Sequence, residues 1–245
     1  MRRIEVLFGS SLLLLFSICF FLPELKQDQN YHNFADTRAF LGIPNTMDTL
    51  SNVAFLLPLL FWITKKTTEI QQLSLKISTN IFLIGMLLTS FGSIYYHLNP
   101  NDETLVYDRL GMSVAFTGVL GMLAACRVSN PLSLLTIIFL IIFAPLSVIV
   151  WKISGNLTYY AVLQFGGILL ILFTLFFTKM NENEPKFIAL LIFYGLAKLT
   201  EAFDIQIFNL TFGIISGHTL KHLLVAYGVY EFIKVFKNKT LKTVD

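Results

Sequence analysis

Eight long apolar stretches dominate the sequence and restrict the folds that it can adopt. A helix needs about 20 apolar residues to cross the roughly 30 Å hydrocarbon core of a bilayer, and its backbone must satisfy its own hydrogen bonds there. The stretches lie near residues 6–22, 49–64, 77–97, 109–126, 132–151, 157–178, 187–204 and 212–233. They predict an all-α, polytopic membrane helix bundle.

The composition agrees with a membrane protein and excludes other classes. Charged residues make up 13% of the chain, against roughly 25% in a soluble domain. A hydrophobic content of 55% excludes a disordered chain, and two cysteines are too few for a disulfide scaffold. Both, Cys19 and Cys126, lie in apolar runs, where a thiol packs as a small hydrophobic group.

The first apolar stretch differs from the others. Arg2 and Arg3 precede it and Pro23 follows it, as in a secretory signal. Because no small-x-small cleavage motif follows, we interpret residues 1–24 as an uncleaved signal-anchor helix, with a cleaved signal as the alternative. The rest of the single domain divides into an external loop at 25–47, a helical core at 48–236 and a cytosolic tail at 237–245.

Lysine and arginine predict the orientation in the membrane, because cytosolic loops carry an excess of both. With the N-terminus in the cytosol, twelve of the 18 basic residues lie inside and four lie outside, while Lys198 and Lys221 fall within spans. The loops at 23–48 and 98–108 then face the exterior, the periplasm or a lumen, and the C-terminus is cytosolic. We interpret the basic tail as a topology anchor, with binding to anionic lipid as the alternative.

Ten ionisable side chains lie within the predicted spans or at their ends. Such groups are costly in a bilayer, so each is a candidate functional residue or half of a buried pair. They are His97, Asp108, Arg109, Lys198, Glu201, Asp204, His218, Lys221, His222 and Glu231. Because three of the chain's four histidines are among them, the histidines are the strongest candidates for a functional site.

The three histidines have the spacing and depth of a metal site. His218 and His222 are four residues apart, which places them on one face of a helix. His97 ends its own span at the same, outer level of the membrane. Three imidazoles that leave one position open are the ligand set of a catalytic zinc ion, although nitrogen ligands favour zinc over copper or iron only loosely. The alternative is that these histidines hydrogen-bond to neighbouring helices.

Two further polar residues are expected at this level. Ser93 lies one helical turn before His97, and Asp108 opens the next span after a ten-residue outer loop. Together with the histidines they form a candidate catalytic set. Alternatively, Ser93 bonds to its own i−4 carbonyl, and Asp108 caps its helix or pairs with Arg109.

A second polar group lies in the seventh span. Spacings of three place Lys198 beside Glu201 and Glu201 beside Asp204, which indicates an internal Lys–Glu pair, with a substrate-headgroup role as the alternative. Lys221 lies about 100° around the helix from His222. It is a candidate partner for Glu201 or Asp204.

Three short motifs resemble those of one known family. They are Ser93-x-x-x-His97, the Asp108 of Tyr-Asp-Arg-Leu, and His218-x-x-x-His222. In order and spacing they are similar to the alkaline ceramidase family, within the wider group of seven-helix membrane hydrolases that includes the adiponectin and progestin receptors. The segment at 45–52, Asn-Thr-Met-Asp-Thr-Leu-Ser-Asn, also resembles the ceramidase entry to the first core helix, and the resemblance covers about residues 30–235.

The resemblance implies a fold and a site. The fold is a seven-helix core, to which the first span adds one N-terminal helix. The zinc ligands would be His97, His218 and His222, with Asp108 and Ser93 beside the metal-bound water. Animal enzymes of the family also hold calcium in an acidic N-terminal loop. That loop has few carboxylates here, so we doubt a calcium site, for which Asp36 and Asn45 are the only plausible remnants.

The expected activity is hydrolysis of a lipid amide. Zinc lowers the pKa of bound water to about 7, Asp108 would act as general base and Ser93 as oxyanion donor. Asp108 could instead orient a histidine ligand. A site at membrane depth favours a lipid substrate such as ceramide, cleaved with water to a sphingoid base and a fatty acid. No nucleic acid and no obligatory protein partner are expected.

Two other classes of function remain open. One is a receptor-like or transport protein with a structural zinc ion. Short cytosolic loops, and the lack of repeats or broken helices, weigh against it. The other is a hydrolase of the same chemistry that acts on another lipid amide or on an ester.

Overall fold

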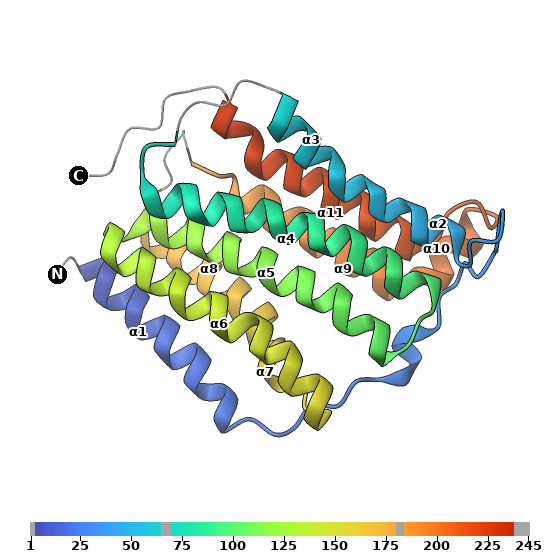
Figure 1. Cartoon of the computed structure of the whole chain (residues 1–245), viewed down its shortest axis with the longest axis horizontal. Coiled ribbons are helices and arrows are strands. Elements are labelled where there is room, and N and C mark those ends of the chain that lie inside the picture. Colours follow the sequence, from blue (N-terminus) through green and yellow to red (C-terminus); the bar gives the residue numbers. More distant parts are fainter. Residues whose placement is uncertain (1–2, 65–69, 180–183, 238–245) are drawn as a thin grey trace.

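The computed structural model describes residues 3–64, 70–179 and 184–237, and these form an elongated bundle of helices (Figure 1). Apart from one isolated bridge between Phe40 and Ile43, all of their regular structure is helical. The α-helices are α1 (Arg3–Ser17), α2 (Thr46–Ser51), α3 (Leu56–Thr64), α4 (Leu73–Leu98), α5 (Asp102–Arg127), α6 (Asn130–Ser154), α7 (Thr158–Ala161), α8 (Gly167–Phe177), α9 (Phe187–Ala202), α10 (Asp204–Leu210) and α11 (Gly217–Ile233). Shorter turns are η1 (Ile18–Phe20), η2 (Gln29–His32), η3 (Asn52–Phe55), the π-helical η4 (Val162–Gly166) and η5 (Lys234–Lys237).

Six helical segments of the described chain are long and apolar enough to cross a membrane, as the sequence predicts for a multi-pass protein. They are Arg3–Phe20, Thr46–Thr64, Leu73–Leu98, Asp102–Arg127, Asn130–Ser154 and Thr158–Phe177. The spans expected at 187–204 and 212–233 also correspond to helices, but α9 has 16 residues and α11 has 17. Most of the expected tail at 237–245 lies outside the described residues, which end at 237.

Helix α5 begins earlier than the sequence suggested. Asp108 does not open this helix, because the side chain of Asn101 accepts a hydrogen bond from the Thr104 amide and caps a helix that starts at Asp102. The polar residues at 102–108 therefore belong to the first two turns of α5 and not to an external loop. Only residues 99–101 join α4 to α5, so the expected loop at 98–108 is wrong in length, and the N-cap alternative for Asp108 is wrong as well.

Glycines allow α4 and α5 to pack with their backbones in contact. A Cβ atom at Gly85 would meet the backbone of Ala115, and one at Gly111 would meet the backbone of Thr89. Small residues allow such close approach in membranes, where van der Waals packing replaces much of the hydrophobic driving force. The close contact fixes the position of the C-terminal end of α4 relative to the start of α5.

The N-terminal helix α1 packs against α6 along one side of the bundle (Figure 1). The ring of Phe16 contacts those of Phe139 and Phe143 at centroid distances of 5.4 and 4.7 Å. Near the other end of α1, Glu5 is buried and accepts a hydrogen bond from the amide of Ser129, just before α6. Helix α1 is therefore part of the folded bundle.

The segment at 21–45 covers one end of the bundle and is held there by specific bonds. The Leu25 amide donates to the hydroxyl of Thr158, and the Ala35 amide donates to Asp204. His32 bridges the Tyr96 hydroxyl and the Asp102 carboxylate at 2.9 and 3.1 Å. The segment therefore closes the end of the bundle at which α4 ends and α11 begins.

Candidate metal centre

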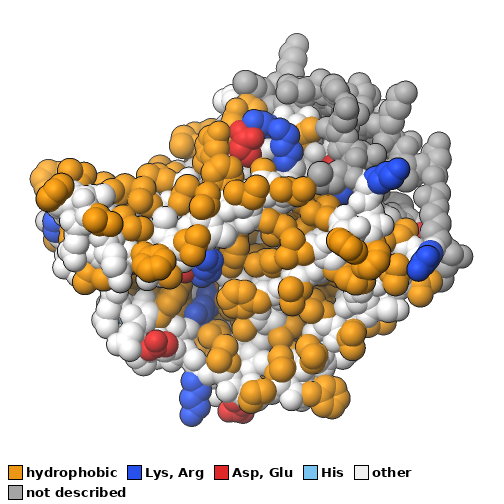
Figure 2. All heavy atoms as spheres, turned by 180° about the vertical axis from the view of Figure 1, so that it is seen from behind, with side chains coloured by type: hydrophobic (Ala, Val, Ile, Leu, Met, Phe, Trp, Pro, Cys, Tyr) orange, Lys and Arg blue, Asp and Glu red, His pale blue; other side chains and the backbone are white. Residues whose placement is uncertain are grey.

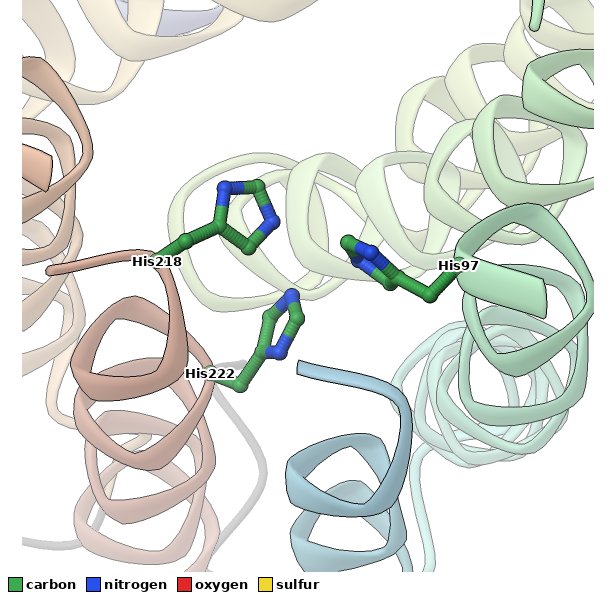
Figure 3. A group of neighbouring side chains, drawn as sticks. All are labelled: His97, His218 and His222. Atoms are coloured by element: carbon green, nitrogen blue, oxygen red, sulfur yellow. The ribbon is translucent and has the colours of Figure 1, made fainter. Parts of the chain in front are cut away.

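Three buried histidines converge at this end of the bundle. His97 comes from the last turn of α4, whereas His218 and His222 come from the first two turns of α11, and Figure 3 shows their rings directed toward a common centre. The ring centroids are 4.9 to 5.2 Å apart, and one ligand nitrogen from each residue lies within 4.8 Å of the others. The exposed fractions are 1%, 4% and 2%. The three histidines are therefore close enough to bind one metal ion.

Buried hydrogen bonds fix the start of α11 and so the two histidines on it. The Asp204 carboxylate accepts from the His218 amide at 2.8 Å. Ser216 is the N-cap, and its hydroxyl and that of Thr219 both donate to the fully buried Asp48, at 2.9 and 2.5 Å. Carboxylates near a helix N-terminus also interact favourably with its dipole. Both acids thus hold α11 in place.

Two of the histidines have a ring nitrogen that is suited to coordinate a metal ion. His222 Nδ1 is 2.7 Å from the hydroxyl of Ser51, which orients the ring and leaves Nε2 for coordination. His97 Nδ1 is buried and has no hydrogen-bond partner within the described structure. A ligand nitrogen needs a lone pair that no protein donor occupies, and the donor set of neutral, buried imidazoles therefore fits a divalent cation such as zinc.

Asp108 and Ser93, the two expected catalytic residues, line one cavity with His222. They are 8% and 3% exposed, and their side chains are within hydrogen-bonding reach of each other. Because α5 begins at Asp102, Asp108 lies in the second turn of a continuous helix.

Arg109 has surroundings of its own and forms no ion pair with Asp108 in the described structure. Its guanidinium lies 4.1 Å from the ring centroid of Trp151 and also contacts the ring of Tyr160. It donates to the side chain of Gln27 in the covering segment. The alternative that Asp108 pairs with Arg109 is therefore wrong. Arg109 instead links the covering segment to the helices of the bundle.

Phe34 covers two of the three histidines. Its ring centroid lies 4.7 Å from that of His97 and 4.6 Å from that of His218. Asn45, in the same covering segment, donates its amide to the main-chain carbonyl of His97 at 2.8 Å. Sequence reasoning did not find Phe34, because an aromatic residue in a polar loop carries no signal of a site.

The histidines adjoin a cavity of about 160 Å³ within the bundle. Its polar lining residues include Ser93, Asp108, Lys198, Glu201, Lys221 and His222, and the rest of its wall is mostly aliphatic and aromatic. Residues of α8, such as Ile171, and of α9, such as Leu190, lie on this wall. Figure 2 shows that hydrophobic side chains cover most of the back of the bundle and surround a hollow in it. The site therefore combines polar groups with an apolar chamber.

The predicted Lys198–Glu201 pair is present, at 2.6 Å, and Lys221 joins it at 2.9 Å from the second carboxylate oxygen. Lys221 Nζ is also 2.9 Å from His218 Nε2, a contact that sequence reasoning did not find. Asp204 is not part of this cluster, because α9 ends at Ala202 and Asp204 starts α10, so the helical spacing no longer applies.

Asp36 and Asn45, the two candidate remnants of a calcium site that the sequence did not favour, have other partners. Asp36 is fully buried and bonds to Arg38 through both carboxylate oxygens, at 2.7 and 2.6 Å. Burial raises the pKa of this carboxyl, but the hydrogen bonds and charge of Arg38 outweigh that effect and leave the pKa below its ordinary value. Asn45 is occupied by the carbonyl of His97. The group of His97, His218 and His222 is the one cluster of metal-ligating side chains found among the described residues.

Comparison with known proteins adds no assignment: no family model matches the chain, and no curated protein matches it.

Proposed function

We propose that this protein is a zinc-dependent membrane hydrolase that cleaves the amide bond of a ceramide-like N-acyl lipid. The observation that carries the proposal is the convergence of three buried imidazoles, one of which, that of His222, lines a largely apolar cavity together with Asp108 and Ser93. An apolar chamber beside hydrolytic groups suits an acyl chain whose scissile bond lies at those groups. The resemblance of the three motifs to alkaline ceramidases supports the same chemistry.

Each residue has a defined part in this proposal. A bound zinc ion supplies a Lewis acid and makes water acidic enough to lose a proton near neutral pH. Asp108 takes that proton and returns it to the leaving nitrogen as the C–N bond breaks and a C–O bond to the acyl carbon forms. Ser93 donates a hydrogen bond to the carbonyl oxygen as negative charge develops there. The products are a fatty acid and a sphingoid base.

Surrounding residues exclude bulk water and hold the ligands. Phe34 covers the rings of His97 and His218, so the apolar cavity is the route that suits a substrate dissolved in the bilayer. Exclusion of water strengthens the electrostatic interactions within the site.

Purified protein, incubated with a panel of lipid amides and esters, tests the activity. We expect fatty acid to be released from an N-acyl sphingoid lipid, to stop on treatment with a zinc chelator and to resume when zinc is added back. His222→Ala, tested alongside, serves as the inactive control. Release from phospholipids or acyl esters alone would favour a different lipid hydrolase. Zinc-loaded protein that releases fatty acid from no lipid would contradict the hydrolase and favour a receptor-like role.

The proposed orientation places the metal centre on the non-cytosolic side. The excess of Lys and Arg at the other end of the bundle supports it. Single cysteines introduced at the exposed positions Lys26 and Lys76, in a variant without Cys19 and Cys126, test this arrangement. An impermeant thiol reagent should label position 26 in intact cells and position 76 only after lysis, and the reverse pattern would overturn the orientation.

A further inference from the structure

A partly buried ion cluster contacts His218 and has no part in the mechanism described above. Glu201 accepts from two lysines, with Lys198 on Oε2 at 2.6 Å and Lys221 on Oε1 at 2.9 Å. The Tyr31 hydroxyl also donates to Oε1, at 3.4 Å. All four residues line the cavity that contains the proposed catalytic groups.

The two lysines are not equivalent. Lys221 is 2.9 Å from His218 Nε2, whereas Lys198 donates to Glu201. The side chain of Lys221 is 17% exposed and that of Lys198 is 38% exposed. Lys221 therefore places its positive charge against His218, whereas Lys198 is connected to that histidine through Glu201 and Lys221.

A lysine in this position is unfavourable for metal binding by itself. An ammonium group next to a divalent cation is repelled by it, and it also uses a lone pair of a ligand nitrogen. With an apolar side chain at position 221, the three histidines would bind the metal more tightly. The position of Lys221 therefore indicates a role toward an anion or a developing negative charge at the same point.

Glu201 keeps Lys221 at the site when His218 binds a cation. Lys221 then gives up its bond to Nε2 but retains its ion pair with Glu201, which lies on α9. Two donor hydrogens of the ammonium remain free to face the cavity. A carbonyl oxygen brought to the metal centre lies within reach of them.

We propose that Lys221 is a catalytic residue that donates a hydrogen bond to the carbonyl oxygen of the scissile amide as it becomes an oxyanion. This inference rests on the proposed lipid amidase activity. One water molecule is consumed, the C–N bond breaks and the C–O bond forms. Lys221 keeps its proton throughout, because its contribution is electrostatic stabilisation in a site that excludes water.

Lys221→Met tests this role, with Lys198→Met as the matched control. Glu201 retains the other lysine in each variant, so neither leaves the partly buried carboxylate without a partner. We expect Lys221→Met to lower kcat by about 10²- to 10³-fold with little change in KM, the effect of removing one oxyanion donor. Lys198→Met should stay within about threefold of the wild type, since an exposed lysine that does not touch the reacting atoms contributes little.

Zinc affinity gives a readout that does not depend on activity. Because a like charge is removed, Lys221→Met should bind zinc about tenfold more tightly or better, measured by competition with a chelator. A residue that merely supports the structure would lower both affinity and turnover. Lys221→Gln, which can still donate to Glu201 but is uncharged, should behave like Lys221→Met and provides a second variant if the first does not fold.

The outcomes separate this inference from the proposed function. An active wild type together with a Lys221→Met variant that keeps kcat within about threefold, or that loses zinc, overturns the role of Lys221 and leaves the hydrolase intact. A wild type that binds zinc but hydrolyses no lipid overturns both. Lower kcat with tighter zinc binding supports both.

Discussion

The hydroxyl of Ser51 lies 2.7 Å from Nδ1 of His222, across 171 residues of sequence. Ser51 also donates to the main-chain carbonyl of Asp48 at 2.9 Å. Because its single hydrogen is used there, the hydroxyl accepts from Nδ1–H of His222. This bond sets the tautomer of the imidazole and leaves Nε2 with a free lone pair that faces the other histidines.

Ser51→Ala should therefore weaken zinc binding without abolishing it. Loss of a group that orients a ligand histidine typically lowers metal affinity about 10- to 100-fold. Chelator competition on the purified protein measures this change. Ser90→Ala is the control, because Ser90 is a fully buried helical serine whose hydroxyl donates to the main-chain carbonyl of Asn52 and not to a histidine, whereas Ser51 is partly buried. Equal losses in the two variants would show that Ser51 acts through general packing.

Asp108→Asn should separate metal binding from catalysis. The amide preserves the shape of the side chain but cannot take a proton, so we expect stoichiometric zinc and a rate about 10²- to 10⁴-fold lower. In contrast, His218→Ala and His222→Ala should lose both zinc and turnover. Metal analysis and fatty-acid release on the same preparations provide the comparison. A His222→Ala protein that still holds one zinc ion per chain would contradict the ligand assignment.

The helices and the histidine cluster were predictable because each depends on local patterns. Long apolar runs specify spans, and the i, i+4 spacing places His218 and His222 on one face. Their equal depth with His97 then follows from the order of the spans. The pairing of Lys198 and Lys221 with Glu201 was also anticipated, because charges buried in a bilayer need partners.

What the sequence did not reveal depends on contacts between distant segments and on helix ends. The cap at Asn101 extends α5 by two turns into residues whose polarity suggested a loop. The bond of Ser51 to His222 joins segments with no pattern in common. The break after Ala202 removes Asp204 from the face of Glu201 and makes it a cap for α11.

Gly92 should control the distance between Ser93 and Asp108. A Cβ atom at Gly92 would lie 2.7 Å from the carbonyl carbon of Tyr107 and 2.9 Å from the Asp108 amide nitrogen, so Gly92→Ala must separate α4 from α5 at the site. We expect a loss of about 1–3 kcal/mol of stability and at least about a tenfold loss of kcat.

Gly118→Ala provides the comparison for Gly92→Ala. A Cβ atom there would meet Phe82 at 2.5 Å in the same helix interface, but more than two turns away from the catalytic groups. Gly118→Ala should destabilise the protein about as much as Gly92→Ala does, but it should lower kcat per folded molecule less. Thermal unfolding in detergent and steady-state kinetics measure the two effects. Equal losses of kcat would mean that Gly92 has no special relation to the site.

Arg127 and Glu184 should stabilise the end of the bundle opposite the histidines. Their side chains are 3% and 6% exposed and form a two-point ion pair, and Arg127 also donates to Thr178 at 2.8 Å. Arg127→Met would leave a buried carboxylate unpaired, so we expect a loss of about 3–5 kcal/mol. The double variant Arg127→Met/Glu184→Leu should recover much of that loss because it removes both charges.

Activity distinguishes this structural role from one in catalysis. The pair lies at the far end of α5 from Asp108 (Figure 1), so kcat per folded molecule should remain unchanged in both variants. Denaturation in detergent and zinc content, measured on the same samples, complete the test. A double variant as unstable as Arg127→Met would show that the guanidinium packs the helices together by its shape and its bond to Thr178, and not by compensating the charge of Glu184.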